Sequence, residues 1–389
     1  MTHLVFVHGV ATRSEASGYV QAVANRDCLF RKVLFRDPEL KIHNPVWGDL
    51  VLPIEEQVYN TNRGIGSFSL GTAAQATGGG LLTGGAATGD NYDLASVARA
   101  KPAVALDALF AQLIEDYDAK GQPIPPEDLE AFAKAAHAIT ADEAAGSNQI
   151  AVDGTEALIG SPASDAALLQ NMAAASTQPA AYGITSAIGD AIAKVTGRVR
   201  NIASRLAFDP LADKARPYVG LFLGDVFTYL RDGTRRVSIR DTIRTALLAA
   251  HVARAPGEKL VVIGHSMGGV ILVDMLCSPT AAGLPDDFRV DSLFTVGSQP
   301  GLFQALGLFL PASEDRIGRP ACVARWYNVF DPVDPLAFRA DPIFAGVEDL
   351  RFDSITGLAS AHTTYFKRPQ FHARARQRLI EANVITGQS

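Results

Sequence analysis

A serine flanked by two glycines is the clearest candidate for chemistry in this sequence. Residues 264–268 read GHSMG and follow the pattern G-x-S-x-G, with an apolar, strand-like run before them and an apolar, helix-like run after them. A very tight turn from a strand into a helix leaves a serine hydroxyl exposed at the edge of a sheet. Gly264 and Gly268 remove the Cβ atoms that would clash with the neighbouring strand and helix. We therefore predict that Ser266 is a nucleophile.

Two other interpretations of this turn are a buried structural serine and a loop that binds phosphate. Phosphate-binding loops carry G-x-x-x-x-G-K-[ST] or G-x-G-x-x-G, and neither pattern occurs at this place. The strand before the turn and the helix after it favour the nucleophile over the structural serine.

The composition narrows the class of protein. The chain has 389 residues, of which 48% are hydrophobic, so it can bury a sizeable core. Its 35 Lys and Arg against 41 Asp and Glu give a net charge of −6, which argues against a nucleic-acid-binding protein. Three scattered cysteines, Cys28, Cys277 and Cys322, are too few for a disulfide framework or a zinc site.

No targeting signal is visible in the sequence. Met1 leads almost directly into an apolar run, without a basic region or a small-residue cleavage site. We expect a cytoplasmic protein, and export without a cleaved signal stays open. No stretch matches the ~20 apolar residues of a membrane span. Peripheral contact with a membrane also stays open, although the acidic net charge gives it no electrostatic help. The sequence indicates no oligomeric state.

Strand-like and helix-like runs alternate in two parts of the chain, residues 1–50 and 218–389. Apolar runs such as HLVFVHG, KLVVIG, SLFTVG and VARWYNVF read as strands, and the segments between them as helices. Ser14 is the expected N-cap of the first helix. Strands separated by helices predict an α/β fold with a mostly parallel sheet and helices on both faces.

The segment 51–217 differs in composition and interrupts this alternation. The 26 residues from 64 to 89 carry no charge and include nine glycines, which predicts a flexible loop near 64–90. Alanine-rich runs after it predict helices, among them 93–120 and 126–145. Because sheet elements lie on both sides, we expect a large, mainly helical insertion into the sheet.

Five short segments, in this order along the chain, resemble the α/β-hydrolase superfamily on its lipase side. The fourth and fifth also resemble the DDHD-domain phospholipases. The segments are VFVHGV at 5–10, GHSMGG at 264–269, FTVGSQPGLF at 294–303, WYNVFDPVDPLAFRADP at 326–342 and SAHTTYF at 360–366. The resemblance covers residues 1–50 and about 220–380, and the segment 51–217 has no part in it. It implies an α/β-hydrolase sheet in which GHSMGG is the nucleophile elbow. It also implies that the helical insertion acts as a lid or cap over the site, or as a structural cap only.

The resemblance also implies the partners of the serine. In this fold the acid and then the base follow the nucleophile along the chain. His362, expected in a loop after the last strand, is the predicted base, whereas His372 is expected at the surface of the closing helix. Asp331 and Asp334 both precede a proline after a strand and both remain candidates for the acid. The DDHD resemblance favours Asp334 and leaves Asp331 as the second choice.

Acyl transfer also needs backbone N–H groups that stabilise an oxyanion. The resemblance implies one donor in the Met267 amide, directly after the nucleophile, and one in the loop after the first strand. We expect the second donor to be the Val10 amide, with Gly9 keeping the backbone slim and His8 supporting the loop through hydrogen bonds. His265 is expected to point away from the site.

The resemblance therefore implies a serine hydrolase, a lipase-like or phospholipase-like esterase in lipid metabolism. It would cleave carboxylic esters with an apolar acyl chain through a catalytic triad of Ser266, Asp334 and His362. The substrate would be an ester or a lipid, and neither a metal nor an organic cofactor is needed. A thioesterase or amidase would use the same triad. The remaining alternatives are a non-catalytic scaffold that binds a lipid or a protein, and a membrane-active glycine-rich insertion.

Overall fold

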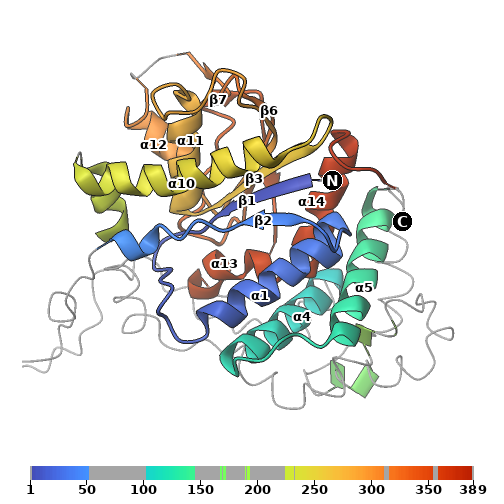
Figure 1. Ribbon diagram of the computed structural model, residues 1–389. Coiled ribbons are helices and arrows are strands. Elements are labelled where there is room, and N and C mark those ends of the chain that lie inside the picture. The colour runs from blue at the N-terminus through green and yellow to red at the C-terminus, as the bar shows by residue number, and fades with distance from the viewer. Residues whose placement is uncertain are drawn as a thin grey trace, which may run out of the picture.

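Six parallel strands form the central sheet of the computed structural model (Figure 1). The structure describes residues 2–51, 102–144, 224–231, 233–310, 315–353 and 358–387, with isolated residues at 167, 168, 170, 171, 189, 191 and 192. Every neighbouring pair of strands in this sheet is parallel. Across the sheet the strands are β2 (Lys41–His43), β1 (Thr2–Val7), β3 (Lys259–His265), β4 (Val290–Val296), β6 (Val323–Phe330) and β8 (Val347–Arg351). The prediction of a mostly parallel α/β sheet is confirmed.

The register of the strands brings their carboxyl ends to one edge of the sheet. Val7 of β1 lies beside Gly264 of β3, and His265 of β3 lies beside Val296 of β4. Val296 in turn pairs with Val329 of β6. The loops that leave these strands therefore start next to one another. A separate pair of short parallel strands, β5 (Ile317–Gly318) and β7 (Phe344–Ala345), lies apart from this sheet.

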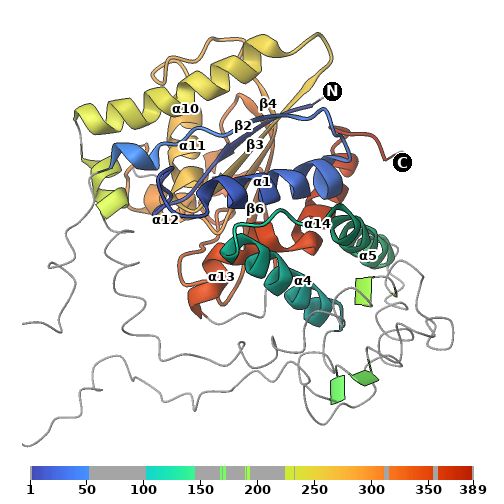
Figure 2. The same ribbon diagram turned by 60° about the horizontal axis from the view of Figure 1, so that its bottom comes forward.

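Helices cover both faces of the sheet, as Figures 1 and 2 show. The strands are apolar on both sides, and successive side chains point to opposite faces. Val5 and Val262 join the core under the first set of helices, whereas Leu4 and Val261 join the core under the second. The first set is α10 (Thr234–Ala253), α11 (Met267–Cys277) and α12 (Pro300–Ala305). The second set is α1 (Tyr19–Leu29), the π-helical turns η1 (Phe30–Phe35), α13 (Leu358–Thr364), the 3-10 turn η5 (Tyr365–Lys367) and α14 (Pro369–Glu381).

Two helices of the segment 51–217 form an outer layer on the α14 side of the molecule. They are α4 (Pro102–Ala119) and α5 (Pro126–Ala144), close to two of the helices expected there. Both pack against α14, and α4 also contacts α1 (Figure 2). Asp107 of α4 accepts the Gln370 backbone N–H at 3.0 Å and forms an ion pair with the buried Arg368 at 3.4 Å. Most other residues of 51–217, including the glycine-rich stretch expected to be a loop, lie outside the described residues.

The first helix starts later than the sequence suggested. Ser14 is not its N-cap, because the helix begins at Tyr19 after Gly18, which has a left-handed φ of 80°. Ser14 instead donates from its backbone N–H and its hydroxyl to the carboxylate of Asp49, at 2.8 and 2.5 Å. This partner is 35 residues away along the chain, so local sequence could not reveal it.

Two histidines near the C-terminus also lie in surroundings that differ from the expected ones. His362 lies on α13, a short helix, and not in a loop. His372 is 0% exposed, although a surface position was expected. Its ring packs against Phe30 and Phe371, and its Nε2–H donates to the Phe366 carbonyl at 2.9 Å.

The described helices include none that is both long enough and apolar enough to cross a bilayer.

The burial of His372 leads to a prediction about stability and pH. Burial lowers the pKa of His372 from 6.5 to about 4, against the raising effect of its hydrogen bond to Phe366. Between these two pH values the unfolded chain binds the proton and the folded chain does not, so stability falls as the pH falls. When the pH falls from 7.5 to 5.5, we expect the free energy of unfolding to decrease more in the wild type than in His372→Gln. The difference between the two decreases should be about 1.4 kcal/mol. Urea unfolding at the two pH values measures this, and an equal loss in both proteins would contradict it.

Candidate active site

Ser266 lies at a strained turn between β3 and α11. Its φ is 51°, in the left-handed region that non-glycine residues seldom adopt. The turn is held by a hydrogen bond from the Ser266 backbone N–H to the Val296 carbonyl at 2.9 Å. A Cβ on Gly264 would lie 2.5 Å from the Gly269 Cα, and one on Gly268 would lie 2.5 Å from the His8 carbonyl oxygen. The close approach of these backbones explains why glycine occupies both positions.

The Ser266 side chain is 0% exposed, so the expectation of an exposed hydroxyl was wrong. The loop after β1 passes directly over it, since a Cβ on Gly9 would lie 2.8 Å from the Ser266 Cβ. The ring of His362 contacts the Ser266 hydroxyl.

Three side chains from three different strand ends form a continuous hydrogen-bonded chain. The Nε2 of His362 lies 2.8 Å from the Ser266 hydroxyl, and its Nδ1 lies 2.9 and 3.1 Å from the two carboxylate oxygens of Asp334. Asp334 and His362 are each 3% exposed. A carboxylate only accepts hydrogen bonds, so the proton sits on Nδ1 and leaves Nε2 free to accept the serine proton. This arrangement can convert a serine hydroxyl into a nucleophile.

Asp334, and not Asp331, is the carboxylate that contacts His362. The Asp331 carboxylate accepts the Val333 backbone N–H at 3.0 Å, within its own turn. Asp334 also accepts the Leu336 backbone N–H and the Tyr365 hydroxyl, both at 2.9 Å. These two donors fix the orientation of the Asp334 carboxylate. The carboxylate in turn orients the His362 imidazole.

Tyr365 is a functional candidate that the sequence reasoning missed. It donates its hydroxyl to Asp334 and accepts the Asp331 backbone N–H at 2.9 Å. Burial, followed by the negative charge of Asp334, raises the pKa of Tyr365, so its hydroxyl stays protonated. The only sequence signal was its position three residues after His362, in the segment SAHTTYF.

His265 and Ser298 support the site through the backbone. His265 donates its Nε2–H to the His362 carbonyl at 2.8 Å and does not contact the Ser266 hydroxyl. Desolvation, followed by the nearby His362, lowers the pKa of His265 to about 3 and keeps the ring neutral. The Ser298 hydroxyl donates to the Ser266 carbonyl at 2.6 Å. Sequence reasoning assigned a role to neither residue, although Ser298 lies in the segment FTVGSQPGLF.

The loop after β1 carries His8, Gly9 and Val10 and is fixed mainly by His8. The His8 Nδ1–H donates to the Gly9 carbonyl at 2.7 Å, and its Nε2 accepts the Trp47 backbone N–H at 3.2 Å. The Trp47 ring stacks on His8 and donates to the His8 carbonyl at 2.8 Å. Burial lowers the pKa of His8 to about 4, which preserves this neutral tautomer at neutral pH. In a trans peptide the C=O and N–H point in opposite directions, so holding the Gly9 carbonyl also aims the Val10 N–H.

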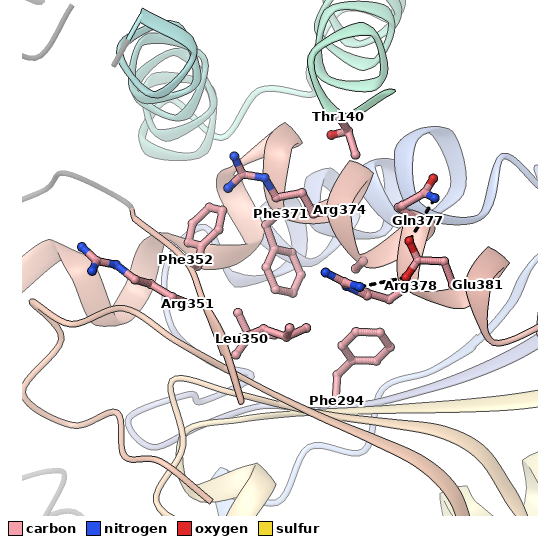
Figure 3. Close-up of a pocket in the computed structure, with 12 residues that line it drawn as sticks. Thr140, Phe294, Leu350, Arg351, Phe352, Phe371, Arg374, Gln377, Arg378 and Glu381 are labelled. Carbon is pink, nitrogen blue, oxygen red and sulfur yellow. Dashed lines mark hydrogen bonds and ion pairs between the residues drawn. The ribbon is translucent and has the colours of Figure 1, made fainter. Parts of the chain in front are cut away.

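A cavity of about 310 Å³ lies between α14 and the sheet, and its lining includes none of Ser266, Asp334 and His362 (Figure 3). Its floor is apolar, with Phe294, Leu350 and Phe371, and its rim carries Arg351, Arg374 and Arg378. At the rim, Arg378 and Gln377 both bind Glu381. The part of the chain that the structure describes contains no cluster of three or more His, Cys, Asp or Glu that could bind a metal.

In the comparison with protein families, residues 287–380 match the DDHD domain. This stretch is roughly a quarter of the chain. It contains Asp334 and His362 but not Ser266. No solved structure gave a significant match.

Two of the similar proteins are named as phospholipases and a third as a phosphatidylinositol transfer protein. A probable mitochondrial phospholipase of Saccharomyces cerevisiae is 33% identical over 95 residues, 22% of this chain and 13% of that protein. An intracellular phospholipase A1 of Caenorhabditis elegans is 41% identical over 59 residues, 15% of this chain and 7% of that protein. A membrane-associated phosphatidylinositol transfer protein 1 of Rattus norvegicus is 37% identical over 92 residues, 21% of this chain and 7% of that protein. The matches thus span only a small part of the length of each relative.

The close packing at the Ser266 turn can be tested by measuring the free energy of unfolding of glycine variants. Gly264→Ala places a methyl group against the backbone of α11, where no flexible side chain can move away, so we expect a loss of about 1–3 kcal/mol of unfolding free energy. Gly318→Ala is the matched control, because a Cβ there meets no atom within 4 Å. The control should change stability by less than about 0.5 kcal/mol. Urea denaturation compares the two, and equal stabilities would show that the turn is looser than described.

Proposed function

We propose that this protein is a serine hydrolase of the α/β-hydrolase fold that cleaves carboxylic esters with an apolar acyl chain. The observation that carries the proposal is the unbroken hydrogen-bonded chain from Ser266 through His362 to Asp334. In this proposal Ser266 is the nucleophile, His362 the general base and Asp334 the acid that orients the base. The strained turn at Ser266 is its nucleophile elbow.

The reaction follows from the positions of the protons. His362 Nε2 takes the proton of Ser266 as its Oγ attacks the ester carbonyl carbon, and Asp334 stabilises the imidazolium that forms. The Val10 and Met267 amides donate to the developing oxyanion. The tetrahedral intermediate collapses, His362 passes its proton to the leaving alkoxide, and an acyl-enzyme remains. Water, activated by the same imidazole, attacks the acyl-enzyme and releases the carboxylic acid.

A lipid ester, such as a phospholipid, is the substrate class we favour. Support comes from the DDHD match and from two similar proteins named as phospholipases. We assign residues 1–50 and 218–389 to the catalytic core and 51–217 to a cap or lid. We place the protein in the cytoplasm, with peripheral contact to membranes as its route to substrate.

The first test of the ester-hydrolysis proposal is a substitution of the proposed nucleophile, Ser266. We expect the wild type to hydrolyse p-nitrophenyl esters within the series from acetyl to palmitoyl, and Ser266→Ala to lose at least about 10³-fold in kcat. The acyl chain that gives the highest kcat/KM measures the length of the acyl pocket. A folded wild type that neither turns over any ester nor reacts with a fluorophosphonate would refute the proposal and favour the non-catalytic scaffold.

The choice of acid is tested with a matched pair of substitutions. Asp334→Asn removes the charge that holds Nδ1 protonated and favours the wrong tautomer, so we expect kcat to fall by roughly 10³- to 10⁴-fold. Asp331→Asn keeps an acceptor for the Val333 N–H and should leave kcat near the wild-type value. Steady-state kinetics on the best ester decide this, and the opposite ranking would make Asp331 the acid.

A further inference from the structure

A buried carboxylate outside the triad binds the loop after β1. Asp225, which is 1% exposed, lies in a helical segment at 224–230. One of its oxygens accepts the Ala11 backbone N–H at 2.8 Å, and the other accepts from Arg13 Nη2 at 2.7 Å. Asp225 lies 214 residues after Ala11 in the sequence, so a distant segment holds this loop.

Ala11 is the residue in this loop that needs to be held. Its φ is 59°, a left-handed conformation that an L-amino acid adopts only when its surroundings fix it. Ala11 directly follows Val10, whose N–H is the proposed oxyanion donor. The peptide before Val10 is fixed by His8 at the Gly9 carbonyl, and the peptide after it is fixed by Asp225 at the Ala11 N–H. Val10 is therefore held on both sides.

The same helical segment also binds the other side of the proposed oxyanion hole. Its Tyr229 hydroxyl donates to the Asp274 carboxylate on α11. Met267, the second proposed donor, is the first residue of α11. Val226 and Tyr229 belong to the same buried cluster as Val10 and Met267. One short segment thus contacts both elements whose amides would bind the oxyanion.

We propose that Asp225 is a positioning residue for the oxyanion hole, fixing the Val10 amide through the Ala11 peptide. This inference rests on the proposed function, because it assigns a role in the transition state of that reaction. Asp225 touches neither the substrate nor the triad. Loss of its hydrogen bond lets the loop leave the strained conformation, so the Val10 N–H no longer points at the oxyanion.

The experiment compares Asp225→Ala and Asp225→Asn with the wild type on a p-nitrophenyl ester. A displacement of about 1 Å in a positioned group can cost 10²-fold in rate, so we expect Asp225→Ala to lower kcat by about 10- to 100-fold with little change in KM. Asp225→Asn keeps an acceptor for the Ala11 N–H and should fall between Asp225→Ala and the wild type. It also guards against a failure of the alanine variant to fold.

The matched control is Asp291, a carboxylate with similar contacts at the other end of the sheet. It accepts the Leu260 backbone N–H at 2.9 Å and pairs with Lys259 at 2.9 Å. Asp291→Ala and Asp291→Asn remove comparable contacts near the start of β3, and we expect kcat to remain near the wild-type value.

A readout specific to the transition state separates positioning from general loosening. An alkyl trifluoromethyl ketone forms a tetrahedral oxyanion on the serine, so its affinity should fall by the same factor as kcat/KM in the Asp225 variants. An unreactive ether analogue of the ester should bind all variants equally. Unchanged kcat in both Asp225 variants, or an equal loss in the Asp291 variants, would overturn the positioning role while wild-type turnover upholds the hydrolase. Failure of the wild type to hydrolyse esters or to react with a fluorophosphonate would instead refute the proposed function.

Discussion

The hydrogen bonds on the two sides of the His362 ring are the interaction on which the site depends. They join Ser266, at the end of β3, to Asp334, after β6, with His362 itself following β8. Such a bridge requires strand ends that lie a fixed distance apart. The parallel order β3-β4-β6-β8 supplies this spacing, because all of these strands end at the same edge of the sheet. Bond lengths of 2.8 to 3.1 Å leave little room for a shift in strand register.

Burial makes this chain of polar groups a strict constraint on its surroundings. Ser266, Asp334 and His362 are each at most 3% exposed, and a buried polar group without partners is strongly destabilising. The Asp334 carboxylate has three donors, from His362, Tyr365 and the Leu336 backbone. Supporting residues of this kind also fix geometry, which is what a preorganised site needs. Stability and the proposed catalysis therefore favour the same contacts here.

Local pattern predicted the regular elements well, because the strands and helices of the core are set by apolar periodicity and by glycine. The parallel α/β sheet and the strand-to-helix turn at 264–268 follow from such patterns. The partners that pattern could not predict are distant in sequence. Tyr365 binds a carboxylate 31 residues earlier, His265 binds a carbonyl 97 residues later, and Ser14 binds Asp49 instead of capping a helix. Periodicity identified neither candidate partner of Ser266. The family resemblance was needed to select His362 and to favour Asp334 over Asp331.

The order of strands also explains how a long segment of chain can lie between two strands without interrupting the sheet. The segment 51–217 lies between β2 and β3, yet β1 separates these two strands in the sheet. Any chain that leaves β2 must therefore cross β1 before it enters β3, and such a crossing lies outside the sheet whatever its length. The described helices α4 and α5 of this segment pack against α14. Asp225, which follows this segment closely, is tied to the loop that passes over Ser266.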